Sequence, residues 1–583
     1  MADLILELHV EEIPPALQQS GIDRLATRLS EKLGEYGLEG RITHRLVTPR
    51  RMGLVITGLP IRQRDRQVEI RGPKVGAPEQ AIQGFLRANG LAEIGQCQKL
   101  IQPQGEWWLI KRNEPGRFVS ELLPTIIEAV LNQFEWPKAM RQGASDFRWC
   151  RPLVAVLAVF EGKPVEARLS LGGKRPLTIN LTDQCHPHSV LGNAFPVRCV
   201  DDYLHGLERG SVIGDFTQRR AKIAADLHQA ASTHGLEWIE NEKLLDRVTG
   251  LVEDPVVMLA ALDDAFKDLP KQVITSCLGT HQGYFMVKDK DRQISHFAFV
   301  ANQPEAKGST AIRDGNLRVA RARLADARFV LERDLKSDFD VWRDQLRTIQ
   351  LYQGLGTLYD KSERLDTLCQ KLARCFQVHP NHAAIMGRLA KCDLASELVR
   401  EFPDLQGFAG SYYYCYFHGA EQSGLIKDAL REQYQPAGPD DDVPKGDPGR
   451  LLAFADRLDQ LAGFWTIGKQ PSGSRDPLAL RRAGLAAIRI LLAQAVFEYD
   501  STDDGFDLRP MIEEALALYG NTDKALAEDL QRFMMARLKN LAPEDALGQA
   551  IAGAVIKDER ARNPFFAGRF IDSLHGFLQE EKG

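Results

Sequence analysis

The hydrophobic periodicity of the chain changes near Gly315, and this change limits the folds that the chain can adopt. Before it, strand-like alternation occurs, as in Leu4–Val10, where Leu and Val alternate with Ile, Glu and His. After it, apolar residues recur at the spacing of a helix, which places one apolar stripe on its surface; the first are Leu317, Ala320, Leu324, Ala327 and Leu331. The sequence therefore predicts a multidomain α+β protein with a mixed α/β N-terminal half and an all-α second half.

Further elements follow from the same patterns. A helix is predicted from the Pro14-Pro15 turn to about Tyr36, and strand-like runs occur at Val47–Ile56 and Trp107–Lys111. Helical patterns cover Val341–Phe376, Asn381–Phe402, Gly449–Phe464 and Leu478–Phe497.

Two segments predict loops in the helical half. Gln435–Pro444 is rich in Pro, Gly and Asp, and Thr466–Ser474 is rich in Gly and Ser. The second leads into Asp476-Pro477, which predicts a helix that begins at Pro477 with Asp476 as its N-cap.

Length and composition restrict the class of protein. At roughly 100–200 residues per domain, 583 residues predict about three to five domains. The net charge of -5 means that nucleic-acid binding must come from local basic clusters. Nine cysteines without a CxxC pair favour reduced thiols over disulfides or a zinc ribbon. No signal peptide is expected and the apolar run Leu485–Val496 is too short to span a bilayer, so we expect a cytoplasmic protein that does not bind membranes.

Motifs that carry nucleotide chemistry are absent from the sequence. It contains no GxxxxGK[ST], no GxGxxG after a strand, no GxSxG and no HExxH. Gly468–Ser474 has the wrong spacing for a phosphate loop and contains a proline. The arginine patterns of class II synthetase active sites are not seen either. These absences favour catalysis by another chain.

Three polar or aromatic clusters could carry a function, but the plainer interpretation is favoured for each. His186 and His188, near Cys185, could meet a metal ion, although more ligands would be needed; the plainer interpretation is a polar surface loop. Arg50-Arg51 follow a proline and are predicted to form a solvated corner. Tyr412–Tyr416 could stack on bases, but a role in a core or a subunit contact is favoured.

The order of many segments resembles the β subunit of bacterial glycyl-tRNA synthetase. Near the N-terminus these are Leu6–Pro15 (LELHVEEIPP), Thr48–Val55 (TPRRMGLV), Arg71–Lys74 with the helix after it, and Pro137–Asp146 with Arg151-Pro152. Closer matches follow at Gly315–Lys336, Leu355–Lys361, Lys391–Leu394, Glu401–Gly407, Tyr434–Pro436, Ala455–Asp459 and Asp476–Arg482. Together these blocks span roughly nine-tenths of the chain in order, which is more specific than a single motif.

The resemblance implies a function and an assembly. Enzymes of this family are heterotetramers of two α and two β subunits that join glycine to its tRNA. The α subunit carries the class II active site with ATP and Mg²⁺, while the β subunit binds and positions tRNA(Gly). We therefore expect an α subunit and tRNA(Gly) as partners, no cofactor or metal in this chain, and no catalytic residues in it.

The resemblance also implies three regions. Residues 1–315 form a mixed α/β region that is B3/B4-like, residues 316–500 an HD-like helical domain, and residues 501–583 a short helical remnant of an anticodon-binding domain. Active HD phosphohydrolases hold a divalent metal with an early His, a His-Asp pair and a late Asp. The matching positions here are His382, Cys392, Asp393 and Asp456. Because Cys392 replaces the central histidine, we expect a degenerate site in which Asp393 and Asp456 make structural hydrogen bonds or salt bridges.

Six arginines are predicted to contact tRNA. On the helix from Leu317, Arg321 and Arg328 border the apolar stripe on one side, Arg323 borders it on the other, and Arg318 lies further around. Guanidinium groups bind phosphate oxygens in a bidentate manner, although pairing with nearby carboxylates is an alternative. Arg481 and Arg482 lie in the first turns of a helix, where the dipole disfavours cations, so tRNA phosphate or a carboxylate is expected beside them.

Several segments depart from the family pattern. Leu278–Phe285 lacks two basic residues, Tyr412–Phe417 replaces small residues, and the C-terminal region is short. Two alternatives therefore stay open: a non-catalytic paralogue that binds tRNA or assists assembly, and an HD-type metallophosphohydrolase, against which Cys392 argues.

Overall fold

The computed structural model describes the chain except residues 103, 189, 304–308, 472–475, 495–506, 558–562 and 581–583. The described chain divides into two compact units. The first comprises Met1–Lys267 with Gln282–Val319, and the second comprises Asp268–His281 with Ala320–Gly583. The predicted boundary at residue 500 lies outside the described residues, so the division into three regions stays a prediction.

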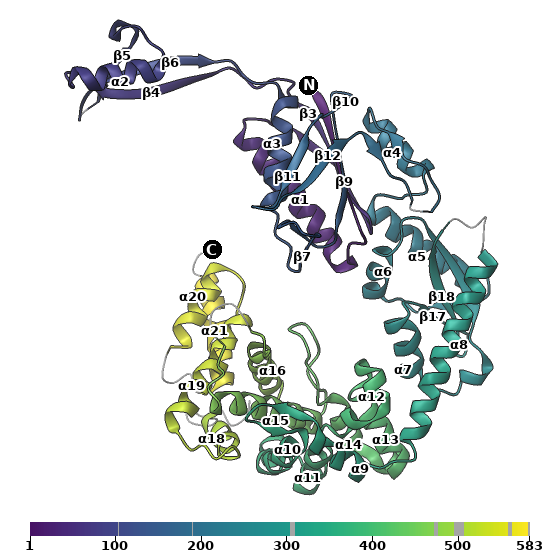
Figure 1. The fold of residues 1–583 in the computed structure, drawn as a ribbon. Coiled ribbons are helices and arrows are strands. Elements are labelled where there is room, and N and C mark those ends of the chain that lie inside the picture. Colours follow the sequence, from purple (N-terminus) through teal and green to yellow (C-terminus); the bar gives the residue numbers. More distant parts are fainter. Residues whose placement is uncertain are drawn as a thin grey trace. The chain divides into compact units, whose positions relative to one another are not determined.

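A largely antiparallel sheet forms the centre of the first unit (Figure 1). Its strands follow the order β11-β12-β9-β1-β3-β2, β10 pairs with β9, and only the contact of β12 with β9 is parallel. The bounds are β1 Ala2–Val10, β2 Arg41–Thr48, β3 Arg51–Leu59, β9 Leu153–Phe160, β10 Lys163–Pro164, β11 Arg168–Leu171 and β12 Leu177–Thr182.

Helices cover both faces of this sheet, so β1 is buried on both sides. Leu4, Leu6 and Leu8 pack in one core with α1 (Pro15–Glu35) and α3 (Val119–Asn132). Ile5 joins a second core with α4 (Val200–Arg209) on the other face. The strand and helix predicted for residues 4–36 are confirmed. Alternate side chains of β1 enter two different cores, one on each face of the sheet.

Between β3 and α3 the chain forms a small module with its own sheet. Its strands pair in the order β4-β6-β5, and Figure 1 shows α2 beside them. The elements are β4 Arg66–Lys74, α2 Glu79–Asn89, the 3-10 turn η1 Ile94–Gln96, β5 Gln98–Gln102 and β6 Gly105–Glu114. The strand-like run at Trp107–Lys111 lies within β6.

A four-stranded antiparallel sheet lies near the end of the first unit's sequence, with strand order β15-β17-β18-β16. Its core includes residues of α5 (Phe216–Ser232) and α6 (Glu242–Thr249). The strands are β15 Glu237–Trp238, β16 Pro255–Ala261, β17 Phe285–Lys288 and β18 Ile294–Asn302; the two-residue strands β7 Met140–Arg141, β8 Arg148–Trp149, β13 Gln184–Cys185 and β14 Phe195–Pro196 form two further pairs, and η2 spans Asp264–Phe266.

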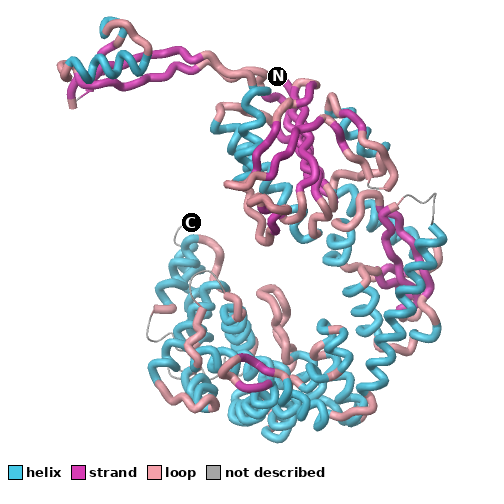
Figure 2. Tube along the Cα trace, viewed as in Figure 1, coloured by secondary structure: helices cyan, strands magenta, loops and turns pink. Residues whose placement is uncertain are grey.

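The helix α8 (Ser309–Asp334) has residues in both units, and the second unit is otherwise almost entirely helical (Figure 2). The predicted change from mixed α/β to α is therefore confirmed. Its elements are α7 Lys271–Ile274, η3 Thr275–His281 (π-helical), α9 Phe339–Gln345, η4 Leu346–Thr348, β19 Gln350–Tyr352, β20 Gly356–Thr357, α10 Leu358–Leu372, η5 Ala373–Phe376, α11 Pro380–Leu389, η6 Cys392–Ala395, α12 Glu397–Glu401, η7 Pro403–Leu405, α13 Phe408–His418, α14 Ala420–Glu432, α15 Asp447–Thr466, α16 Leu480–Leu492, α18 Arg509–Ala517, α19 Lys524–Met535, η8 Ala536–Asn540, α20 Ala546–Val555 and α21 Pro564–Glu580.

Three local predictions in this unit are wrong. The helical run predicted for Asn381–Phe402 is broken after α11, where Lys391 adopts the left-handed conformation before η6. The helical pattern Val341–Phe376 is interrupted by the hairpin of β19 and β20, in which Gly354 of the turn and Gly356 at the start of β20 both have positive φ. The helix expected from Pro477 begins at Leu480 instead, because Ala479 adopts the left-handed conformation. The loop at Gln435–Pro444 is confirmed. None of the described helices is long and apolar enough to cross a membrane.

Candidate nucleic-acid interface and buried polar clusters

The helix α8 carries four of the six arginines predicted to contact tRNA. Its apolar stripe is confirmed: Ala320, Leu324, Ala327 and Leu331 are buried. The arginines lie around this stripe, with Arg318, Arg321 and Arg323 exposed and Arg328 half-buried. Six arginines stand against four acidic residues on α8, so the helix carries a local positive charge in a chain that is negative overall.

Carboxylates neighbour some of these arginines. Arg328 forms an ion pair with Asp268, and this hydrogen bond lowers the pKa of the Asp268 carboxyl. Arg323 Nη1 lies 3.8 Å from Glu401 Oε1, with both side chains about half exposed. The alternative of carboxylate pairing therefore applies to Arg328 and, more loosely, to Arg323.

The other two predicted arginines lie at the start of α16. Arg481 is half-buried and Arg482 is exposed. The Asp476 carboxylate accepts hydrogen bonds from the backbone N–H groups of Leu480 (2.8 Å) and Arg481 (2.9 Å). Burial and the nearby Arg481 charge both lower the pKa of Arg537, whereas Asp476 raises it. This helix end thus gathers arginines around one carboxylate, which is already engaged by backbone donors.

The four positions expected to match an HD metal site, all among the described residues, are not arranged as one. His382 is exposed on α11, whereas Cys392, Asp393 and Asp456 are buried. Burial raises the pKa of the Cys392 thiol. Among the residues that the structure describes, no group of three or more His, Cys, Asp or Glu side chains is arranged to hold a metal ion.

Asp393 and Asp456 instead make structural contacts. Asp393 accepts hydrogen bonds from the Gly407 N–H (2.6 Å) and the Tyr434 hydroxyl (2.9 Å). Asp456 forms ion pairs with Lys361, Lys391 and Arg457. The expectation of hydrogen bonds and salt bridges at these two carboxylates is confirmed.

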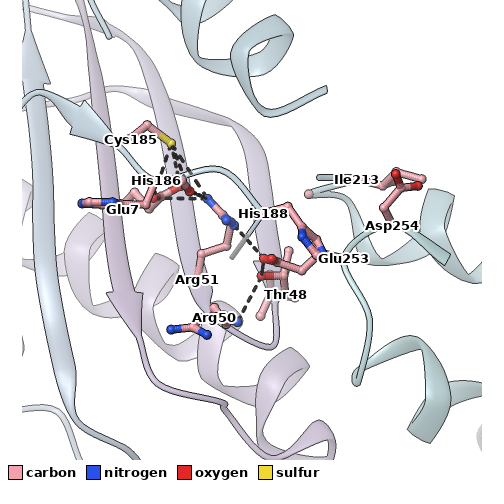
Figure 3. A network of polar contacts seen from close by, with 12 residues as sticks. Glu7, Thr48, Arg50, Arg51, Cys185, His186, His188, Ile213, Glu253 and Asp254 are labelled. Carbon is pink, nitrogen blue, oxygen red and sulfur yellow. Dashed lines mark hydrogen bonds and ion pairs between the residues drawn. The ribbon is translucent and has the colours of Figure 1, made fainter. Parts of the chain in front are cut away.

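A buried polar cluster in the first unit surrounds Arg51 (Figure 3). The Arg51 side chain is fully buried, and its guanidinium lies between Glu7 and Glu253. Nε donates to Glu253 Oε1 (3.1 Å), and Nη1 donates to Glu7 Oε2 (3.3 Å) and to the His186 carbonyl (2.9 Å). The prediction of a solvated corner at Arg50-Arg51 is wrong for Arg51, because Arg51 is the first residue of β3 and points toward the acids beneath it.

Other groups complete this cluster. Glu7 Oε2 also accepts a hydrogen bond from the Tyr203 hydroxyl (2.6 Å), and Glu253 Oε1 accepts one from Thr48 Oγ1 (2.6 Å). Although burial opposes it, the Arg51 guanidinium holds the pKa of Glu253 below its usual range. The contacts join β1, β3, α4 and the segment before β16, and they stabilise the junction between the seven-stranded sheet and the four-stranded sheet of this unit.

The interpretation of the His186–His188 segment as a polar surface loop is also wrong in part. His186 is exposed, but Cys185 and His188 are buried. Burial raises the pKa of the Cys185 thiol, which donates toward Glu7 Oε1 at 3.6 Å. These side chains extend the Arg51 cluster, and no metal-binding group of described residues includes them.

The sequence carries one signal for this cluster. Glu7 and His9 share a face of β1 with Ile5. One face of this strand is wholly apolar and therefore buried. If the other face is covered as well, a charged residue on it is also buried and needs a partner of opposite charge. Nothing in the local pattern, however, identified Glu253 as a partner across 202 residues.

Comparisons with known proteins cover most of the chain. The family model described as "Glycyl-tRNA synthetase beta subunit" matches residues 4–557. The glycine–tRNA ligase beta subunit of Rhodospirillum centenum is 33% identical over 609 residues, covering 100% of this chain and 83% of the relative. That of Ruegeria sp. is 36% identical over 597 residues with the same coverages, and that of Klebsiella pneumoniae subsp. pneumoniae is 34% identical over 592 residues, covering 99% and 83%.

Proposed function

Because the chain belongs to the family of glycyl-tRNA synthetase beta subunits, we propose that it binds tRNA(Gly) along α8 and positions it for an α subunit. The α subunit of the ligase carries the active site, with ATP and Mg²⁺ bound there, and this chain contributes no catalytic residue. Two copies of each subunit form the working assembly. The reaction takes place in the cytoplasm, and all nine cysteines are free thiols, as that compartment favours.

The distribution of charge on α8 supports this proposal. The buried stripe fixes the rotation of the helix, so Arg318 and Arg321 are held at exposed positions. Arg323 is only loosely paired, at 3.8 Å from Glu401, and exposed pairs of this kind contribute little stability. A phosphate can therefore replace the carboxylate at small cost. Arg328 forms an ion pair with Asp268, so its main role is to orient the helix, and it contributes less to tRNA binding.

The start of α16 is proposed as a second contact. Arg481 and Arg482 face a helix N-terminus that Asp476 already caps, and Arg537 adds charge beside Arg481. A tRNA phosphate there offsets the repulsion between the arginines and the helix dipole.

Charge reversal on α8 tests the first contact. In Arg318→Glu/Arg321→Glu, we expect tRNA(Gly) affinity to fall by more than about tenfold, since each bond of a charged group contributes roughly 1.5–3 kcal/mol. The slope of log K against log salt should fall by about two, roughly one for each lost phosphate contact. Both quantities are measured by fluorescence anisotropy across a salt series.

A matched control reverses two charges elsewhere. The side chain of Arg28 on α1 is 50% exposed, and that of Arg532 on α19 is 67% exposed. Arg28→Glu/Arg532→Glu should keep the salt slope of the unchanged chain. If the two double variants lose affinity equally, α8 is not the contact surface. Tight tRNA binding without glycylation, in a mixture whose α subunit works with another β chain, would instead identify a binding or assembly paralogue.

A further inference from the structure

The second unit contains a buried group of charged side chains that we call the ionic cluster. At its centre, Asp456 on α15 is only 5% exposed. Lys361 Nζ lies 2.9 Å from Asp456 Oδ1, and Lys391 Nζ lies 3.0 Å from Oδ2. The cluster comprises Lys361, Arg364, Lys391, Asp393, Asp456, Arg457 and Asp459.

Every carboxylate oxygen of the two cluster aspartates on α15, Asp456 and Asp459, has a cationic neighbour. Arg457 Nη1 donates to Asp456 Oδ2 at 2.6 Å. Lys361 Nζ donates to Asp459 Oδ2 at 3.0 Å, and Arg364 Nε donates to Asp459 Oδ1 at 2.7 Å. Lys361 thus bridges Asp456 and Asp459 from α10, in the way that a metal ion bridges carboxylates.

Lys391 links Asp456 to the third carboxylate of the cluster, that of Asp393, through the Tyr434 side chain. Its ammonium nitrogen lies 3.9 Å from the centre of the Tyr434 ring, and the Tyr434 hydroxyl donates to Asp393 Oδ1. Lys391 has a φ of 67°, a conformation that few non-glycine residues adopt. This backbone geometry at the residue before η6 points the side chain into the cluster. Burial lowers the pKa of Lys391 to about 8, so the group stays protonated at neutral pH.

The donor set does not suit a divalent metal. In an active HD site, histidines and aspartates surround the ion. Here His382 is exposed, and the Cys392 Sγ lies 4.0 Å from the Arg388 carbonyl. Four cationic side chains already face three carboxylates in the ionic cluster. A divalent ion would add charge to a cluster that is positive without it.

We propose that the ammonium groups of Lys361 and Lys391 occupy the electrostatic role of the metal in this degenerate HD site. They neutralise Asp456 and Asp459 and hold α10 and the segment before η6 against α15. The unit is consequently independent of metal ions, whereas an active HD domain depends on them. The role of these two lysines does not depend on tRNA binding, and it can be measured without an activity assay.

The first measurement compares thermal unfolding of the full chain in millimolar Mn²⁺ and in EDTA. The unfolding temperature should be the same in both, and the purified chain should hold much less than one equivalent of divalent metal. Stoichiometric metal that Asp456→Asn removes would overturn the proposal.

The second measurement restores the need for a metal. Lys361→Ala/Lys391→Ala removes both ammonium groups, opens space beside Asp456 and changes the formal charge of the cluster from +1 to -1. The unfolding temperature should fall by roughly 5–15 °C, as when one partner of a buried pair is removed. Millimolar Mn²⁺ should recover part of that loss of unfolding temperature in the variant only. If a folded variant shows no recovery, the ammonium groups do not take the place of a metal ion.

Lys371→Ala/Lys524→Ala removes two exposed lysines of the same unit and is the matched control. It should unfold like the unchanged chain and show no Mn²⁺ effect. If the double cluster variant does not fold, the single variants Lys391→Met and Lys391→Arg replace it. Arginine keeps the charge and should unfold at a higher temperature than methionine. A Met variant as stable as the unchanged chain overturns the proposal.

Discussion

Arg51 is fully buried between the carboxylates of Glu7 and Glu253, and its removal leaves both without this cationic partner. We expect Arg51→Met to lower the free energy of unfolding by about 3–5 kcal/mol, because a buried charge without its partner is costly. Arg51→Lys should recover little, since Lys cannot reproduce the planar guanidinium that reaches Glu7, Glu253 and the His186 carbonyl together. Chemical denaturation of the first unit measures both.

The neighbouring Arg50 gives the matched control for that experiment. Its side chain is 26% exposed, and Nη2 lies 3.4 Å from Glu11 Oε2. Arg50→Met should cost less than about 1 kcal/mol, as for other exposed pairs. Equal costs at the two positions would show that the Arg51 cluster does not stabilise the unit.

His9 should make the first unit sensitive to acid. Burial, together with the Arg51, His186 and Arg50 charges, lowers its pKa from 6.5 to about 4, although Glu253 opposes the shift. The folded state therefore keeps His9 neutral while the unfolded chain binds a proton. Stability from this residue is complete above pH 6.5 and decreases as the pH falls through 4, by about 3 kcal/mol.

His9→Gln removes this titration and is expected to flatten the loss of stability between pH 6.5 and 4. Unfolding temperatures measured across this range provide the comparison. His228→Gln, which changes an exposed histidine on α5 of the same unit, is the comparison variant. If His9→Gln and the unchanged chain lose stability in parallel, His9 is not buried as a neutral ring.

The N-terminus of α16 depends on a cap that sequence rules misplaced. Asp476 does not precede the first helical residue directly, but reaches the N–H groups of Leu480 and Arg481 across a turn. Asp476→Ala should cost about 1 kcal/mol, as for other N-caps, and should raise the repulsion among the nearby arginines. Pro477→Ala should cost less, because Pro477 lies outside the helix. Thermal unfolding of the two variants separates these effects, and a larger loss for Pro477→Ala would contradict this assignment.

Elements with a sustained apolar stripe were predicted well, because burial of the stripe determines them. The stripe of α8 and the strand β1 are the clearest cases. Breaks within elements were predicted poorly. The hairpin at Gln350–Thr357 and the left-handed Ala479 depend on single backbone angles, which hydrophobic periodicity does not encode.

The candidate site shows the same limit. The arginines around the α8 stripe were found because they lie on one helix. Their partners Asp268 and Glu401 come from other elements, and so do Glu253 beside Arg51 and Lys361 beside Asp456. A single sequence without the fold does not pair residues across such separations.

The chain as a whole should unfold in two steps, since each compact unit has its own core. Leu6 in the first unit and Leu458 in the second are almost completely buried. Leu→Ala at either position should cost about 2–5 kcal/mol and lower one calorimetric transition by at least about 5 °C while leaving the other in place.

Leu251 and Leu425 provide matched controls, because each is 53% exposed, one in each unit. Their Leu→Ala variants should shift neither transition. Helix α8 belongs to both units: its residues up to Val319 lie in the first unit, and its buried residues from Ala320 onward lie in the second. The calorimetric experiment therefore decides whether this helix couples the unfolding of the two units. If α8 couples the two units, the chain unfolds in one common transition, and a buried Leu→Ala substitution in either unit lowers the temperature of that transition. In that case, tRNA bound along α8 as proposed should stabilise both units together. If the transitions separate, tRNA bound at the proposed contact should raise chiefly the temperature of the second transition, because Arg321, Arg323 and Arg328 belong to that unit.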